Sequence, residues 1–189
     1  WVKAGLESIQ FWGELPLYTG FVKNGSLLVA CAEDRYILAR FKPHLPEEVQ
    51  TTVATKDIEP ALSGQFQSGL HLAEEAHLDP RKTMTSLCEW LEKKDVDLNT
   101  NQGVAKDPDW TIDCRGMAAN EKGIRGVKGE TLLVRNPEFE LSRPVRLMHP
   151  RYPLYIIPRG NGIFMIGATV IESGENENVS LRSSMELMS

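Results

Sequence analysis

The chain has 189 residues, of which 41% are apolar and 25% charged, and its formal net charge is −5. This is the composition of a soluble globular protein, with length for one large domain or two small ones. The basic residues are scattered and outnumbered by acidic ones, which argues against a nucleic-acid partner. No apolar run reaches membrane-spanning length, so we also expect no membrane partner.

The cysteines and histidines do not form a recognisable metal or disulfide pattern. Cys31, Cys88 and Cys114 lie far apart, and no two of them form a CxxC pair. The four histidines contain no HExxH spacing. We therefore expect no metal site, no disulfide framework and a reduced, cytoplasmic location.

The first third of the chain alternates helical and extended patterns. Apolar residues three and four apart predict a helix over 2–15, and Asn24-Gly25 predicts a turn before a buried strand over 26–32. Asp34 is placed to cap a second helix that runs to about Phe41. Residues 43–68 are expected to be mostly loop, with a short apolar anchor at 58–62, before a strand over 69–73.

In the middle of the chain, Asp79-Pro80 is a strong helix start, because Asp caps free amides and Pro is favoured at the first helical position. An apolar stripe follows at Met84, Leu87, Cys88 and Leu91. Short strands are predicted over 96–99 and 110–114, separated by a polar loop.

The second half reads mainly as strands. Residues 127–135 and 145–148 fit single strands, and 154–173 fits a hairpin around the Asn161-Gly162 turn. These strands follow one another without helices, which implies antiparallel pairing. The predicted fold class is α+β: a mixed, largely antiparallel sheet with helices on one face.

Several polar residues have both a structural and a functional interpretation. Tyr155 places a hydroxyl in an apolar strand, where it needs either a structural carbonyl or a ligand as partner. The charged residues Glu74, Glu75, Lys128, Glu130 and Arg159 are all expected to lie in solvated turns or on exposed strand surfaces.

Seven segments, in this order and spacing, resemble the D-amino-acid oxidase family of FAD-dependent enzymes, and most closely the glycine oxidases of thiamine biosynthesis. They span most of the chain and lie at 24–30, 58–62, 77–81, 109–119, 126–130, 154–159 and 167–170. The resemblance implies hydride transfer from glycine or a similar small amino acid to FAD, which gives an imine, and reoxidation by oxygen, which gives hydrogen peroxide.

The resemblance also implies a domain division. Residues 1–75 and 123–179 would form the two parts of a substrate domain, 76–122 a piece of the FAD-binding domain, and 180–189 the start of a helix. Tyr155 matches the family's contact to the substrate carboxylate, and Val170 matches an apolar residue of the substrate pocket. Val104 matches a position whose backbone meets the adenine end of FAD. Gly116 lies in the same piece of the flavin domain, where the missing β-carbon either permits close approach of FAD or simply serves a turn.

Two departures from the family pattern lead to further expectations. No GxGxxG occurs, and the family's carboxylate-binding arginine would lie beyond residue 189. We therefore expect a fragment of a longer protein, truncated at both ends, inactive by itself and able to associate as a homo-oligomer through exposed apolar surface. The alternative is a non-catalytic α+β binding or structural module that retains the family fold.

Overall fold

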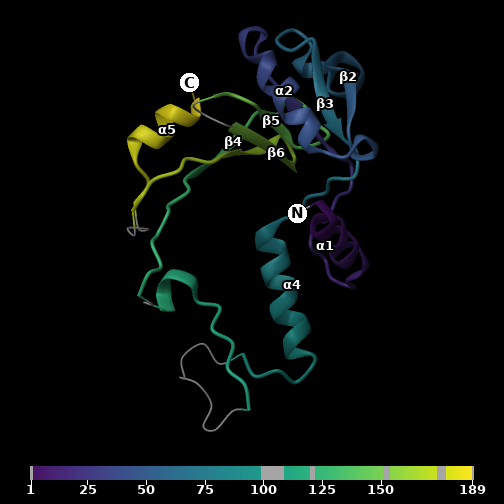
Figure 1. Ribbon diagram of the computed structural model, residues 1–189. Coiled ribbons are helices and arrows are strands. Elements are labelled where there is room, and N and C mark those ends of the chain that lie inside the picture. Colours follow the sequence, from purple (N-terminus) through teal and green to yellow (C-terminus); the bar gives the residue numbers. More distant parts are fainter. Residues whose placement is uncertain (1, 99–108, 120–121, 151–153, 174–177, 189) are drawn as a thin grey trace.

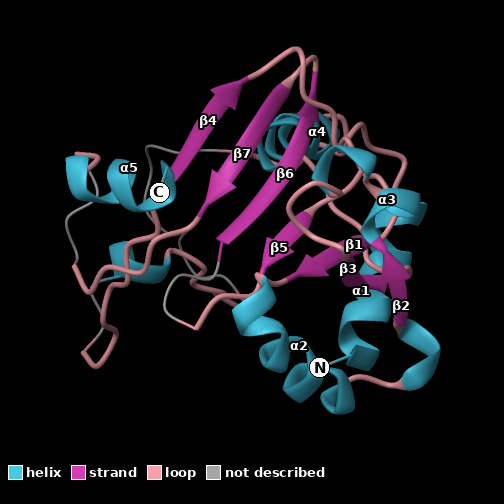
Figure 2. Cartoon of the chain, turned by 90° about the horizontal axis from the view of Figure 1, so that it is seen from above, coloured by secondary structure: helices cyan, strands magenta, loops and turns pink. Residues whose placement is uncertain are grey.

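The computed structural model describes residues 2–98, 109–119, 122–150, 154–173 and 178–188. At its centre is a seven-stranded sheet in the order β2-β3-β1-β5-β6-β7-β4 (Figure 1, Figure 2). Neighbouring strands are antiparallel except β1 and β5, which run parallel. The strands are β1 (Ser26–Val29), β2 (Thr51–Ala54), β3 (Ser68–Leu72), β4 (Thr131–Arg135), β5 (Val145–Leu147), β6 (Leu154–Gly160) and β7 (Ile163–Gly167). The predicted α+β class, with a mixed and largely antiparallel sheet, is confirmed.

Five helices accompany the sheet in the described ranges. They are α1 (Val2–Glu14), α2 (Arg35–Phe41), α3 (Thr55–Ile58), α4 (Pro80–Glu92) and α5 (Leu181–Met188). Single 3-10 turns occupy Ala32–Asp34, Lys42–His44, Glu47–Val49, Pro60–Leu62 and Gly116–Ala119. The predicted helices over 2–15 and 34–41 and the helix beginning at Pro80 are all present.

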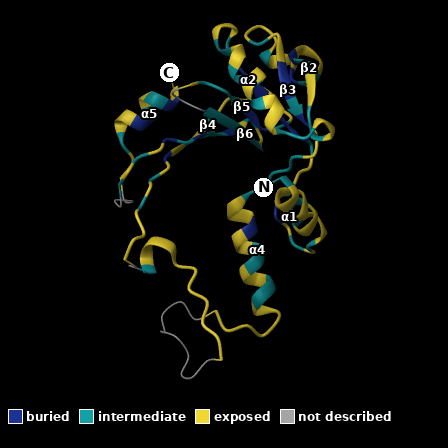
Figure 3. Cartoon of the chain, viewed as in Figure 1, coloured by how far each residue is buried: buried dark blue, intermediate teal, exposed yellow. Residues whose placement is uncertain are grey.

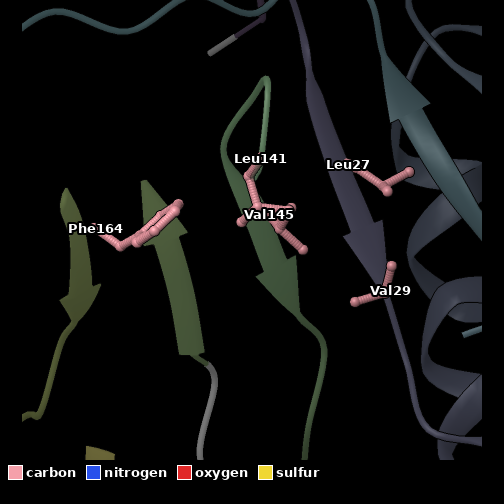
Figure 4. Close-up of a cluster of buried hydrophobic side chains, with 5 residues drawn as sticks. All are labelled: Leu27, Val29, Leu141, Val145 and Phe164. Atoms are coloured by element: carbon pink, nitrogen blue, oxygen red, sulfur yellow. The ribbon is translucent and has the colours of Figure 1, made fainter. Parts of the chain in front are cut away.

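Each face of the sheet has its own buried apolar cluster, because side chains alternate along every strand. The first cluster contains Leu27, Val29, Leu141, Val145 and Phe164 (Figure 4). Ile58 of α3 and Leu62 of the following turn pack against this cluster. The second cluster, on the opposite face, contains Leu28, Leu70 and Leu72 and packs against Leu38 and Phe41 of α2. The sequence indicated helices on one face of the sheet, whereas in the structure helical residues pack against both faces.

A buried ion pair joins the first half of the chain to the second. Glu59 has only 2% of its surface exposed and lies 2.8 Å from Nε of Arg143. The Glu59 carboxylate also accepts hydrogen bonds from the backbone N–H and the hydroxyl of Ser142. The apolar anchor at 58–62 therefore contains one charged residue, Glu59, whose contacts fix the chain just before β5.

The β6–β7 hairpin turns at Asn161-Gly162, as the sequence predicted. Gly160, Asn161 and Gly162 have φ values of 81°, 53° and 67°, in the left-handed region that glycine and asparagine tolerate. The register shifts between Pro158 and Gly160, which accommodates the turn. The second strand of the hairpin ends at Gly167 and does not continue to Ser173, where only an isolated bridge between Lys128 and Ile171 remains.

Helix α4 projects away from the sheet, and the chain makes a long excursion before it returns in β4 (Figure 1). Asp79 caps this helix as predicted, accepting hydrogen bonds from the N–H groups of Arg81 and Lys82 at 3.0 and 3.3 Å. Figure 3 shows that most of α4 and of the following segment is exposed. Met84 in the predicted apolar stripe is 62% exposed.

Four local predictions were wrong. Residues 96–98 and 110–114 are not strands, because the structure places no neighbouring strand beside them in its described ranges. The segment over 43–68 was expected to be loop but contains β2, which pairs with β3 at the sheet edge. Asp34 precedes α2, but its side chain makes no capping hydrogen bond.

Candidate functional site

The second face of the sheet is covered on one side and open on the other. Helix α2 covers it over β1 and β3, whereas Leu133 on β4, which points to the same face, is 59% exposed. A cross-strand row on this open half runs from Arg146 on β5 through Tyr155 on β6 and Gly167 on β7 to Thr131 on β4. We call these four residues the open-face row.

Tyr155 is half-buried in the open-face row. A β-carbon built on Gly167 would lie 2.7 Å from the Tyr155 hydroxyl oxygen and 2.8 Å from Cζ, so the phenol ring lies directly against this glycine. In the described part of the chain the hydroxyl has no hydrogen-bond partner. Of the two interpretations left open by the sequence, a bond to a structural carbonyl is therefore not observed.

Tyr155 lines a cavity of about 450 Å³ that continues toward the start of β1. The lining residues come from the open half of the sheet and from the segment after β3, and they are Gly25, Ser26, Glu75, Ala76, His77, Pro144, Arg146, Tyr155 and Ile157. We call this the Tyr155 cavity. It therefore combines a free phenol with a cation, a carboxylate and an imidazole.

Glu75 and Arg146 form an ion pair in the wall of this cavity. Nη2 of Arg146 lies 3.2 Å from Oε2 of Glu75, and the hydroxyl of Ser26 donates a hydrogen bond to the same oxygen. The Glu75 side chain follows a turn and keeps 34% of its surface exposed, in line with the solvated turn expected there, but Ser26 and Arg146 also reach it from two different strands. Each charge in the wall compensates the other, so the cavity carries polar groups without a large net charge.

His77 also lines the Tyr155 cavity, and Arg159 lies near enough to act on its charge. Burial lowers the pKa of His77, and the neighbouring Arg159 cation lowers it further, so the ring is neutral at pH 7. Arg159 was expected to be a surface charge. It is partly buried and donates to the backbone oxygen of Leu78 at 2.8 Å, with Nη2 3.6 Å from the sulfur of Met165.

Val170 does not share the Tyr155 cavity. It lies three residues past the end of β7, where it is 78% exposed and lines a separate cavity of about 520 Å³. That second cavity is bordered by the Lys128–Glu130 segment and by the N-terminal turn of α5. The structure therefore does not bring Tyr155 and Val170 together.

Glu130 was expected to be exposed, but it is one of the most buried charged residues, with 5% exposure. It lies 2.9 Å from Nζ of Lys128 and accepts hydrogen bonds from the backbone N–H and the hydroxyl of Ser180. Hydrogen bonds from Ser183, Lys128 and Ser180 lower the pKa of Glu130 to about 2. The Ser180 hydroxyl also accepts from the N–H of Ser183, which is the geometry of a helix cap. The sequence carried one signal for this cap, the Ser-x-x-Ser spacing before the apolar residues of α5.

The two proposed FAD-contacting residues lie in the excursion between α4 and β4. Gly116 is exposed with φ +57°, and no atom lies within 4 Å of the place where a β-carbon would be. Beside it, Arg115 forms a 2.7 Å ion pair with Asp113, and hydrogen bonds from Arg115 lower the pKa of Asp113 to about 2. Val104 falls outside the described residues.

No group of three or more His, Cys, Asp or Glu side chains in the described ranges is arranged to hold a metal ion. None of the helices in these ranges is long and apolar enough to cross a membrane.

Comparison with known proteins assigns the family. The model of the FAD dependent oxidoreductase (DAO) family matches residues 1–189. A Rhizobium etli protein that carries the provisional name thiamine biosynthesis oxidoreductase ThiO is 41% identical over 184 residues, which cover 94% of this chain and 56% of that protein. The chain thus spans about half the length of this curated relative.

Solved structures support the fold. Glycine oxidase from Bacillus cereus superposes with a TM-score of 0.74 at 13% identity, over 98% of this chain and 62% of that one. L-α-glycerophosphate oxidase from Mycoplasma pneumoniae, solved with FAD bound, superposes with a TM-score of 0.69 at 16% identity, over 98% and 61%. At this identity the likeness concerns the fold, whereas the family match covers the whole sequence: the chain belongs to the FAD dependent oxidoreductase family.

Proposed function

We propose that the protein to which this chain belongs oxidises glycine or a similar small amino acid with FAD as cofactor, giving an imine and hydrogen peroxide. The names of the Rhizobium etli relative and of the Bacillus cereus glycine oxidase support this assignment, and the first also supports a role in forming the thiazole of thiamine. The chain by itself holds part of this machinery, and we expect it to be inactive.

The observation that carries the proposal is the free hydroxyl of Tyr155 on the open half of the sheet. A half-buried phenol without a partner among the described residues is available to donate to a ligand. A carboxylate is a suitable acceptor, because a hydrogen bond to a charged oxygen is stronger than one between neutral groups. In this proposal Tyr155 binds and orients the substrate carboxylate, and the wall of the Tyr155 cavity excludes water from it.

The residues present also fit part of a flavin site. A glycine with positive φ and open space around it, as at Gly116, permits close approach of a backbone to a cofactor. The exposed apolar residues Trp110, Ile112 and Met117 lie in the same segment. When bound, FAD supplies the hydride acceptor and passes the electrons to oxygen. We assign residues 76–122 to the FAD-binding domain, 1–75 and 123–179 to the substrate domain, and 180–189 to the start of a further helix.

The test is steady-state oxidation of glycine by the whole protein, measured as peroxide, in wild type and in Tyr155→Phe. Loss of a hydrogen bond to a charged group is expected to raise KM for glycine roughly tenfold or more, with a smaller effect on kcat. Tyr36→Phe is the matched control, because Tyr36 lies exposed on α2 outside the Tyr155 cavity.

Two outcomes would contradict the proposal at different points. A whole protein that purifies without flavin absorbance and makes no peroxide from any small amino acid would favour the non-catalytic module. A yellow, active protein whose KM is unchanged in Tyr155→Phe would retain the oxidase function and remove Tyr155 from the substrate site.

A further inference from the structure

The phenol of Tyr155 rests on a position where the chain has no side chain. Tyr155 and Gly167 are direct cross-strand partners in β6 and β7. A β-carbon on Gly167 would meet Oη of Tyr155 at 2.7 Å, Cζ at 2.8 Å and Cγ2 of Thr131 at 2.9 Å. Contacts shorter than 3.0 Å essentially never occur at real β-carbons, so an alanine at this position would force the ring to move.

Gly167 is the last residue of β7, and its peptide bond to Ala168 is cis. Gly167 is absent from the glycines with positive φ, in contrast to Gly160 and Gly162 of the same hairpin. It is paired on both sides, with Tyr155 on β6 and Thr131 on β4. A glycine in a strand often marks the close approach of another group, and here the approaching group is the Tyr155 phenol.

The neighbouring residues restrict where a displaced ring could go. On the other side of Tyr155, the open-face row continues with Arg146, which is held by Glu75. On the far side of Gly167, Thr131 already fills the space over β4. A ring pushed off Gly167 therefore carries its hydroxyl away from the position that it has in this structure.

We propose that Gly167 is a positioning residue for the oxidation reaction: its missing side chain forms the seat that fixes the Tyr155 hydroxyl where it can meet the substrate carboxylate. This inference rests on the function proposed above. Gly167 acts through Tyr155 and does not itself touch the substrate.

The experiment compares Gly167→Ala, Tyr155→Phe and the double variant in the whole protein. If Gly167 acts through the hydroxyl, Gly167→Ala raises KM for glycine roughly tenfold or more, as Tyr155→Phe does, with kcat affected less. In the double variant the second substitution adds little, because the hydroxyl is already gone. Gly129→Ala is the matched control, since its nearest contact would be an ordinary 3.5 Å.

A second readout does not depend on activity. Protein labelled with 3-fluorotyrosine gives one fluorine signal for each tyrosine, and Tyr155→Phe identifies the signal of Tyr155. Gly167→Ala is expected to shift that signal and to leave the Tyr36 signal in place. If Gly167→Ala alone does not fold, adding Thr131→Ser removes the Cγ2 methyl from the three closest contacts, and the same measurements apply.

The outcomes separate this inference from the proposed function. A Tyr155 signal that stays in place in Gly167→Ala overturns the seat, whatever the activity. An unchanged KM in Gly167→Ala, or losses that simply add in the double variant, overturn the positioning role. A wild-type protein that makes no peroxide refutes the proposed function, and with it the positioning role, whereas the fluorine signal still decides whether Gly167 seats the ring.

Discussion

Gly160 and Gly162 flank Asn161 in the β6–β7 turn, and the two glycines are required for different reasons. Both have positive φ. A β-carbon on Gly162 would also lie 2.8 Å from Cα of Pro137 and 2.9 Å from the backbone oxygen of Asn136, whereas nothing lies within 4 Å at Gly160. Both contacts of a β-carbon on Gly162 would be with backbone atoms, which cannot move aside as the end of a flexible side chain can.

Alanine at these two positions is therefore expected to have unequal effects. Gly160→Ala should cost about 1–2 kcal/mol, the strain of a left-handed alanine. Gly162→Ala should cost about 3 kcal/mol, because overpacking against the 136–137 backbone adds to that strain. Urea unfolding of both variants measures the difference, and equal losses would show that the backbone contact at Gly162 contributes nothing.

At single positions, most local signals in the sequence were reliable, with the cap expected at Asp34 as an exception, whereas long-range contacts were missed. The turn at Asn161-Gly162 and the cap at Asp79 depend on neighbouring residues, so the sequence contains all the information that they require. Glu75, Glu130 and Arg159 were expected to be solvated, yet each contacts a partner 50 or more positions away. Nothing in the immediate sequence of a charged residue reveals such a partner.

Among the elements, α4 shows how a helix is defined by its first residue. Asp79 caps two of its N–H groups, yet none of the apolar side chains in its stripe is buried among the described residues. The buried residue of the helix is Thr83. The Thr83 hydroxyl donates to the backbone oxygens of Asp79 and Thr19. The cap and these polar contacts therefore largely fix the position at which α4 starts.

Removal of the cap should be measurable for this reason. Asp79→Ala leaves the N–H groups of Arg81 and Lys82 without their acceptor and is expected to lower the free energy of unfolding by about 1 kcal/mol. Asp79→Asn is the control, because asparagine caps about as well as aspartate. Urea unfolding followed by helical circular dichroism checks both variants. Equal losses in the two would mean that the charge of Asp79, and not its cap, stabilises the helix.

Strand prediction succeeded or failed according to whether a partner strand was available. The sequence located β1, β4, β5, β6, β7 and most of β3, whose apolar residues pack into the two buried clusters. Residues 110–114 have a strand-like pattern, but Trp110 and Ile112 are 88% and 85% exposed. Strand propensity expresses how a residue fits a packed, paired surface, so without such a surface the pattern does not produce a strand.

In the whole molecule, the arrangement of the sheet depends on contacts that are remote in sequence. The parallel pairing of β1 with β5 joins residues more than 100 positions apart, and the Glu59–Arg143 ion pair fixes the same crossing. The fold class could be predicted from the order of helix and strand patterns. The strand order could not, because it depends on which distant strands meet at the centre.

A second long-range contact connects the edge of the sheet to the last helix. Glu130 immediately precedes the edge strand β4, and its carboxylate holds Ser180, the residue that caps α5. Its backbone N–H donates a hydrogen bond to the hydroxyl oxygen of Thr169, at 3.0 Å. Glu130 therefore joins β4, the segment after β7 and α5, the last through its carboxylate, whose ionised form is the one that the Ser180 donors favour.

This contact predicts how acid destabilises the molecule. The pKa of Glu130 is lowered from an ordinary 4.5 to about 2, so the unfolded chain takes up a proton at higher pH than the folded one. The stabilisation from Glu130 is thus fully present above pH 4.5 and is lost as the pH falls toward 2.

Glu130→Gln should lower stability at pH 7 and flatten the decline in stability between these two pH values. Urea unfolding at a series of pH values measures both effects, with Glu140→Gln, an exposed carboxylate near β5, as control. A decline as steep in Glu130→Gln as in wild type would mean that other carboxylates set the acid sensitivity and that α5 does not depend on the charge of Glu130.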